Sequence, residues 1–160
     1  LGTMGEGGYP TIDRRFPGSF GSAYMDFVVP KVILFRPEHS RRVFVDEVDF
    51  ISAPGISPPD VCRPGGPKFL VTELCLMSFN AERARFRLES VHSPHTMEEV
   101  RDNTGFDFDV ADTVLVTPEP EADRLNVLRS RVGAEIGNTY PGFASRVFGI
   151  EPTKEAVAPS

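Results

Sequence analysis

The sequence predicts a mixed α/β domain, and three observations favour it. Two runs rich in β-branched and aromatic residues, at 69–79 and 84–92, flank the short polar segment Asn80–Arg83, a pattern typical of a β-hairpin. The apolar run at 31–36 (KVILFR) has the length and composition of a buried strand. Two stretches with helical character follow, at about 97–104 and about 121–132.

The first of these helices carries its own start and stop. Residues 96–99 (TMEE) form a capping box, in which Thr96 caps the helix and the Glu99 side chain reaches back toward it. Gly105 then stands where a helix commonly ends. We therefore expect a short helix that packs on the predicted sheet.

Other segments have patterns of their own. Residues 41–50 alternate apolar and polar side chains, which favours a strand or irregular extended chain. The Pro- and Gly-rich stretch 52–67 is predicted to be a loop, and 112–116 (DTVLV) a short strand. The second helix follows Pro118 and Pro120, and its apolar positions recur at helical spacing: Ala122, Leu125, Leu128 and Val132.

The two ends of the chain have little periodicity. We therefore divide the single predicted domain into a loop segment at 1–24, a core at 25–135 and a tail at 136–160. The tail after Gly133 is expected to fray or to wrap a neighbouring chain. We also expect other chains to order the loop segment.

The overall composition excludes several classes of protein. A net charge of −6 argues against a nucleic-acid-binding surface, and no apolar run approaches the length of a membrane span. Cys62 and Cys75 stand outside any zinc-ligand spacing; Cys75 is expected in the core and Cys62 as an exposed thiol. No feature suggests secretion, so we expect a cytoplasmic protein.

The opening segment at 14–27 (RRFPGSFGSAYMDF) contains a candidate site. Its small residues Gly21, Ser22 and Ala23 precede the apolar run at 27–35 (FVVPKVILF), and a small-residue loop before a strand is a common place for backbone to approach a ligand. Alternatively, the segment is only a tight loop that leads into the strand and binds no ligand. Tyr24 either closes a pocket or packs on a partner.

The order of motifs resembles the C-terminal part of the β subunit of family I CoA transferases, the glutaconate CoA-transferase type. The opening segment is similar to that family's Arg, Pro-Gly, Gly-Gly-Ala and Asp pattern. Residues 33–55 (ILFRPEHS…SAPG) resemble its next strand, Glu-His-Ser turn and Pro-Gly loop. The block at 69–108, with TMEEVRDNTGF, resembles its most recognisable stretch. Together the motifs cover about residues 10–135 in unbroken order.

The resemblance implies a mixed sheet flanked by helices, in a heteromer of α and β subunits. It implies that a glutamate attacks an acyl-CoA thioester, with CoA as substrate and no further cofactor. That glutamate is expected outside this chain, in an N-terminal part of the β subunit, so no catalytic residue is assigned here. The substrate-binding residues are Gly21, Ser22, Ala23 and Tyr24. The chain is then a piece or processed product of a longer subunit.

Three departures from the family pattern leave alternatives open. The Gly-Gly-Ala core has Ser22 in place of a glycine, Tyr24 and Met25 precede Asp26, and the family's His-Pro-Gly turn is His92-Ser93-Pro94-His95. A hydrolase or decarboxylase of CoA thioesters on the same fold is therefore an alternative, as is a non-catalytic scaffold subunit.

Other polar residues have bland interpretations. Glu6 is taken as a solvated carboxylate and His39 as a structural residue, with a place near the site as its alternative. His92 and His95 lack a third metal ligand, so no metal site is expected. The arginines that could contact CoA phosphates, with solvated surface residues as the default, are Arg14, Arg15, Arg41 and Arg42.

Overall fold

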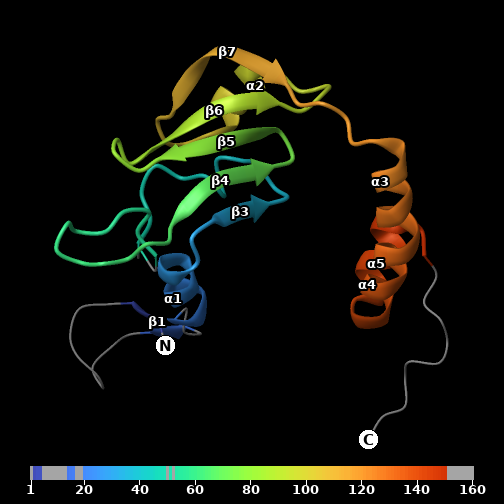
Figure 1. Cartoon of the computed structure of the whole chain (residues 1–160), viewed down its shortest axis with the longest axis horizontal. Helices are drawn as coiled ribbons and strands as arrows, with labels where there is room; N and C mark the ends of the chain where they lie inside the picture. Colours follow the sequence, from blue (N-terminus) through green and yellow to red (C-terminus); the bar gives the residue numbers. More distant parts are fainter. Residues whose placement is uncertain (1, 5–13, 17–19, 50, 52, 151–160) are drawn as a thin grey trace, which may run out of the picture. The chain divides into compact units, whose positions relative to one another are not determined.

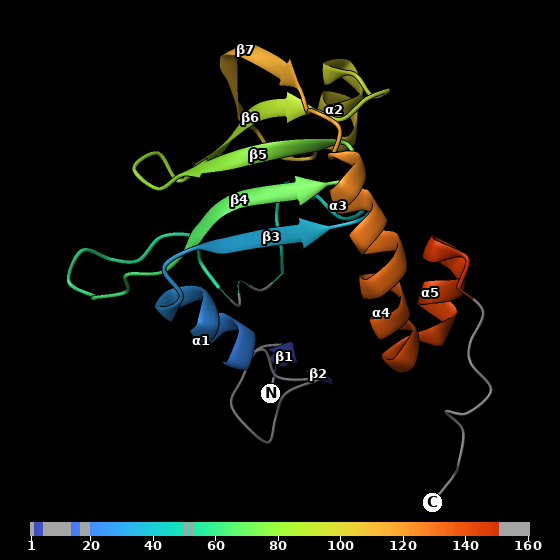
Figure 2. The same cartoon turned by 45° about the vertical axis from the view of Figure 1, so that its right-hand side comes forward.

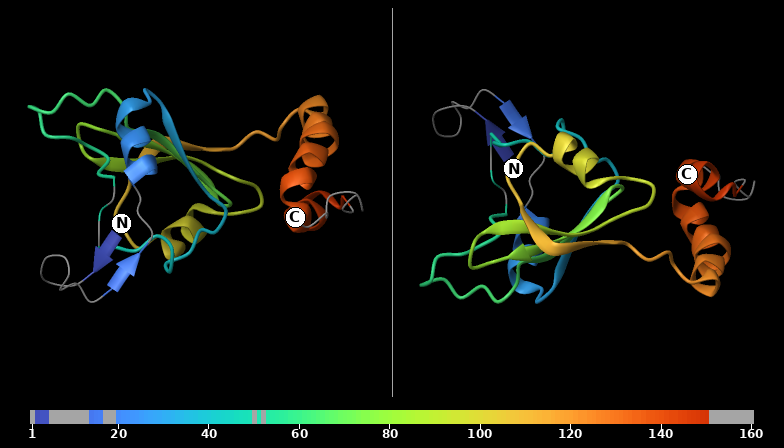
Figure 3. Two further views of the ribbon diagram at one scale, coloured as in Figure 1. Left: turned by 90° about the horizontal axis from the view of Figure 1, so that it is seen from below. Right: turned by 90° about the horizontal axis from the view of Figure 1, so that it is seen from above.

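A computed structural model describes residues 2–4, 14–16, 20–49, 51 and 53–150. The chain forms two compact units, which meet in sequence between Thr117 and Pro118 rather than near 135 (Figure 1). The first unit contains the sheet and the helices α1 and α2, and the second contains the helices α3 to α5. An extended connection joins β7 to α3 (Figure 3).

A five-stranded mixed sheet forms the first unit, in the order β3-β4-β5-β6-β7 (Figure 1). The outer pairs β3–β4 and β6–β7 are parallel, whereas β4–β5 and β5–β6 are antiparallel. This arrangement confirms the predicted mixed α/β class. The strands are β3 (Val32–Arg36), β4 (Pro67–Thr72), β5 (Cys75–Asn80), β6 (Arg85–Val91) and β7 (Asp109–Val116).

The run at 69–79 is two strands rather than the single strand that its composition suggested. The chain turns at Glu73 and Leu74, and β5 returns antiparallel to β4. The Thr72 hydroxyl makes this turn possible, because its Oγ1 accepts hydrogen bonds from the backbone N–H groups of Leu74 and Cys75, both at 3.1 Å. The predicted hairpin between β5 and β6 is confirmed, with Phe79 paired to Phe86.

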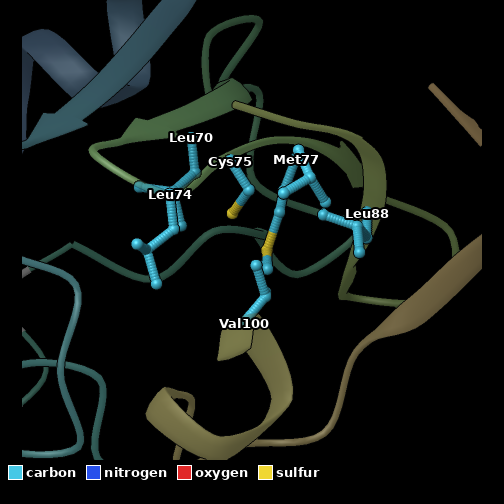
Figure 4. Packing of buried hydrophobic residues seen from close by; sticks show 7 residues of the cluster. Leu70, Leu74, Cys75, Met77, Leu88 and Val100 are labelled. Carbon is cyan, nitrogen blue, oxygen red and sulfur yellow. The ribbon is translucent and has the colours of Figure 1, made fainter. Parts of the chain in front are cut away.

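The core lies between the sheet and α2 (Met97–Asn103), as Figure 4 shows. Met77, Leu88 and Val100 are fully buried, so the central strands and the helix contribute to one cluster. Cys75 belongs to the same cluster, as predicted, and Cys62 is an exposed free thiol. The cluster comprises Leu70, Leu74, Cys75, Met77, Leu88, Val91 and Val100.

The predicted cap of α2 is present, with one difference. Thr96 Oγ1 accepts a hydrogen bond from the Glu99 N–H at 3.2 Å, as expected. The Glu99 carboxylate, however, binds His95 Nδ1 at 3.0 Å rather than the backbone of Thr96. Gly105 follows the helix. A side chain at this position would clash with the Phe44 carbonyl oxygen, which explains the glycine.

Replacement of Thr96 by alanine should therefore destabilise the first unit by about 1 kcal/mol, because one orphan N–H of α2 loses its acceptor. Urea unfolding followed by circular dichroism measures the change. Any activity that the family resemblance implies should stay within about twofold of the parent at a temperature where both are folded. A large loss of that activity at unchanged stability would place the functional site beside α2.

The β3 strand is present as predicted, but it is not buried within this chain. It is an edge strand, and Ile33 and Phe35 are 56% and 70% exposed. Residues 37–49 after it form turns rather than the strand considered for 41–50. Continuous apolar character is typical of a parallel strand covered on both faces. The β3 edge therefore has the composition of a sheet interior.

The second unit corrects the prediction for the tail. A helix runs from α3 (Ala122–Val127) through a π-helical turn (Leu128–Val132) into α4 (Gly133–Thr139), and α5 (Pro141–Phe148) follows. The helix continues through Gly133. A Cβ atom there would lie 2.8 Å from the Ile150 side chain, so the glycine permits close packing. Residues 151–160 lie outside the described part.

The loop segment at 1–24 also contains regular structure. Strands β1 (Gly2–Met4) and β2 (Arg14–Phe16) pair antiparallel, and helix α1 (Phe20–Val28) begins before the segment ends. Glu6 lies outside the described residues. None of the described helices is long and apolar enough to cross a membrane.

Candidate functional site

The candidate site residues Gly21–Tyr24 lie in helix α1, not in a loop, so that part of the prediction was wrong. The small residues occupy the first turns of the helix. The segment at its other end fixes α1 in place: the Gly65 N–H donates to the Phe27 carbonyl oxygen at 2.8 Å. The Arg63 guanidinium also lies 4.0 Å from the centroid of the Phe27 ring.

The first turn of α1 still offers backbone donors. The N–H groups of the first three residues of an α-helix, here Phe20, Gly21 and Ser22, have no acceptor within the helix. Gly21 is exposed, and among the described residues nothing lies within 4 Å of a Cβ built on it. Glycine inside a helix is unfavourable relative to alanine. Packing against the described residues does not require a glycine at this position. The turn is open to an approaching group.

An apolar pocket of about 480 Å³ lies beside this helix, between α1 and β3. Figure 2 shows α1 next to the β3 edge of the sheet. Ala23, one of the predicted site residues, lines the pocket; Gly21 and Tyr24 do not. The other lining residues are Met25, Asp26, Val29, Lys31, Val32, Ile33, Leu34 and Ala53.

Asp26 is the acidic residue of this pocket. It is only 9% exposed, and burial raises the pKa of its carboxyl above the ordinary value of 3.8. It also lines a second apolar pocket of about 280 Å³, together with Leu34, Phe79 and Phe86. Sequence reasoning matched Asp26 to the family pattern but gave it no role. The spacing of Ala23 and Asp26, three residues apart on a helix, could have placed both on one face.

His39 is a structural residue, as its bland interpretation predicted. Thr104 Oγ1 donates to the Val100 carbonyl oxygen at 2.7 Å, so it accepts from His39 Nε2 at 2.9 Å. Thr72 Oγ1 accepts two backbone N–H groups and donates to His39 Nδ1 at 2.8 Å. The ring is therefore neutral with its proton on Nε2, and burial lowers the pKa of His39.

The other two histidines lie in separate hydrogen-bond networks. His92 contacts Thr117 Oγ1 through Nδ1 at 2.7 Å and the Thr72 carbonyl oxygen through Nε2 at 3.1 Å. His95 pairs with Glu99. Within the described residues, no group of three His, Cys, Asp or Glu side chains is arranged to hold a metal ion.

The described arginines that were considered for phosphate binding have local partners. Arg41 Nε donates to the Asp102 carbonyl oxygen at 2.7 Å, at the C-terminal end of α2, where a cation is favourable. Arg42 forms an ion pair with Glu38, four residues earlier in the sequence. The side chains of Arg14 and Arg15 lie outside the described part.

The chain is similar in sequence to B subunits of CoA transferases. The chain is 31% identical over 127 residues to the B subunit of glutaconate CoA-transferase from Acidaminococcus fermentans, covering 74% of this chain and 47% of that protein. It is 31% identical over 140 residues to the B subunit of the 3-oxoadipate CoA-transferase of Pseudomonas knackmussii, covering 82% and 54%. The chain belongs to the family of CoA-transferase B subunits. No protein-family model matches it.

Relatives with other activities share the same fold. The chain is 31% identical over 99 residues to the IpdB subunit of a cholesterol ring-cleaving hydrolase from Rhodococcus jostii, covering 58% of this chain and 38% of that protein. The crystal structure of IpdAB from this organism matches with a TM-score of 0.64 at 26% identity, covering 78% of this chain and 52% of that one. The crystal structure of the AibA/AibB decarboxylase matches with a TM-score of 0.56 at 25% identity, covering 79% of this chain and 48% of that one.

This member of the family of CoA-transferase B subunits spans about half the length of the curated relatives that it matches. Its sheet agrees with the solved structures of the family. Those structures contain two kinds of subunit, as the names IpdAB and AibA/AibB state. In those proteins the matching subunit is one part of a larger assembly.

Proposed function

We propose that this chain forms part of the B subunit of a heteromeric acyl-CoA transferase, which moves CoA between carboxylic acids. The observation that supports this best is the open first turn of α1 beside an apolar pocket. Backbone N–H groups suit a developing oxyanion, and the pocket suits an acyl chain. CoA enters as a substrate, and the reaction requires no further cofactor.

In this mechanism a glutamate supplied from outside this chain attacks the thioester carbonyl carbon. CoA leaves, and then displaces the acid from the glutamyl group to give an enzyme glutamyl-CoA thioester. A second acid accepts CoA in the return reaction. The N–H groups of Gly21 and Ser22 stabilise the oxyanion of the first step, because no bulky side chain at Gly21 keeps the thioester away.

The test uses the assembled enzyme, with all its subunits, mixed with an acyl-CoA. A transferase should retain about one equivalent of covalently bound CoA per active site and pass it to an added acid, with ping-pong kinetics. Release of free acid and free CoA in equal amounts, with no acceptor present, would contradict the proposal. That result would favour hydrolysis of the thioester instead of transfer.

We further propose that the β3 edge receives the polypeptide that completes the B subunit. The match with this chain covers only 47% and 54% of the two relatives, so the rest of a full-length subunit is available to cover the edge. The strand presents apolar side chains to both faces of the sheet, and its neighbour β4 is parallel to it. An apolar strand added beside β3 fits this edge, and the α-type subunit completes the assembly.

Replacement of Phe35 by aspartate should therefore abolish assembly while this chain still folds. Phe35 is 70% exposed here, so the charge costs little in the isolated chain, but it would be buried in the completed sheet. Size-exclusion chromatography of the co-expressed subunits measures assembly. Asn80→Asp is the matched control: it adds the same charge at an exposed position in the β5–β6 turn and keeps the acceptor for the Arg83 N–H. Equal assembly of both variants would contradict the proposed interface.

The proposed compartment is the cytoplasm. Both cysteines are free thiols, Cys62 exposed and Cys75 buried, which is compatible with a reducing environment. Fractionation of cells that express the native assembly tests this location directly.

A further inference from the structure

A pocket of about 260 Å³ lies at the C-terminal end of α2, apart from the candidate site. It shares no lining residue with the pocket beside α1, and Figures 1 and 2 show α2 near β6 and β7 but α1 near β3. Three segments form its walls. They are the turn after β3, with Arg41, the last turn of α2, with Arg101, and residues 104–108, which lead to β7.

Two arginines bring positive charge to this pocket without a carboxylate partner. Arg41 donates from Nε to the Asp102 carbonyl oxygen, and the Arg101 guanidinium lies 5.9 Å from the centroid of the Phe108 ring. Neither arginine forms an ion pair with a carboxylate of the described residues. By contrast, four other arginines of the same unit each pair with a described carboxylate: Arg42, Arg83, Arg85 and Arg87.

The negative charge near the pocket leaves these donors available. Asp107 is the acid among the lining residues, but its side chain is 98% exposed and its carboxylate lies 3.8 Å from Arg85. The C-terminal end of α2 carries a partial negative charge, and Arg41 Nε already binds the Asp102 carbonyl oxygen there. The terminal nitrogens of Arg41 and the guanidinium of Arg101 therefore retain hydrogen-bond donors for a ligand.

The arrangement of these donors suits a phosphate group. Each guanidinium is a planar fork that binds two oxygens at once. A phosphate ester presents three acceptor oxygens and up to two negative charges, so it can bind both forks, whereas a single carboxylate satisfies one. The walls are also held together: the Gly105 N–H donates to the Phe44 carbonyl oxygen at 2.7 Å, which joins the segment after α2 to the turn after β3.

We propose that Arg41 and Arg101 form a binding site for a phosphate group, which bridges the turn after β3 and the end of α2. The phosphate belongs either to a separate small ligand or to the nucleotide end of CoA. The site does not depend on the proposed transfer reaction, because binding of phosphate is measured without turnover.

Isothermal titration calorimetry of the assembled protein with potassium phosphate, at constant ionic strength, tests the site. The parent should bind about one phosphate per copy of this chain, and Arg101→Gln should weaken this binding by at least about tenfold. Arg101→Lys keeps the charge but loses the fork, so it should retain part of the affinity. Arg42→Gln is the matched control. It removes the same charge beside Arg41, from an arginine outside the pocket lining, and should change the affinity by less than about twofold.

Absence of saturable binding to the parent at up to about 10 mM phosphate would overturn the site, as would equal losses in Arg42→Gln and Arg101→Gln. Circular dichroism checks that the variants are folded. If Arg101→Gln does not fold, Arg101→Lys decides, and parental affinity in that variant would overturn the site. A repeat of the titration with saturating CoA identifies the source of the phosphate. Loss of phosphate binding would assign the site to a phosphate of CoA, and unchanged affinity would assign it to a separate ligand.

Discussion

Replacement of Gly21 by valine is expected to lower turnover of the assembled enzyme by about a hundred- to a thousandfold, the typical loss when one oxyanion donor is removed. The physical reason is steric. Gly21 is the second residue of α1, and no described atom lies within 4 Å of its Cβ position. A valine there fits within this chain but occupies the space from which a thioester would approach the free N–H groups. Steady-state kinetics with an acyl-CoA donor measures the loss.

The chain offers a matched control for this substitution. Gly142 is also the second residue of a helix, α5, and it too has nothing within 4 Å of a Cβ. Gly142→Val should therefore have the same effect on helix propensity and little effect on rate. Ser22→Gly, which restores the residue of the family pattern, should be neutral or mildly activating. If Gly21→Val assembles and turns over at the parental rate, α1 has no part in the reaction.

The central sheet could be predicted from the sequence because its signals are local. The hairpin of β5 and β6 follows from alternation on either side of a short polar turn, and the Thr96 cap from a four-residue motif. The turn between β4 and β5 had no such signal. The Thr72 hydroxyl accepts hydrogen bonds from two backbone N–H groups of the turn, within a run that is mostly apolar and contains no glycine or proline.

Helix α1 was predicted as a loop because its first residues have low intrinsic helix propensity. Its contacts come from a segment almost forty residues later: Gly65 binds the Phe27 carbonyl oxygen, and a Cβ at Gly65 would lie 2.6 Å from backbone atoms of Phe27 and Val29. Single-sequence patterns do not contain such a contact. The pocket beside α1 was missed for the same reason, since its walls also include residues of β3 and Ala53.

The exposure of β3 has a different cause. The pattern of β3 correctly indicates a strand with apolar side chains on both faces, yet Ile33 and Phe35 are exposed. In the proposed interface the rest of a longer subunit covers this strand, and the relatives have such additional length. The composition of a strand reflects its burial in the complete assembly. A strand such as β3 is therefore exposed when its covering segment is not included.

Replacement of His39 by leucine is expected to destabilise the first unit by about 2–4 kcal/mol, since the buried hydroxyl groups of Thr72 and Thr104 each lose one of their hydrogen bonds. The ring also packs on Phe44, with centroids 4.5 Å apart, so the residue joins the segment after β3 to both the sheet and α2. Urea unfolding followed by circular dichroism measures the loss. His95→Leu, which removes a surface pair with Glu99, should cost no more than about 1 kcal/mol.

The same experiment repeated at lower pH identifies the protonation state of His39. Burial lowers its pKa in the folded chain below the ordinary value of 6.5, so on acidification the unfolded chain binds the proton first. The stability that neutral His39 contributes is complete above about pH 6.5 and declines as the pH falls through the lowered folded pKa. The difference in stability between the parent and His39→Leu should therefore be smaller at about pH 5.5 than at about pH 7.5. A difference that grew on acidification would mean that the ring is protonated in the folded state, with Thr72 accepting from Nδ1 instead of donating to it.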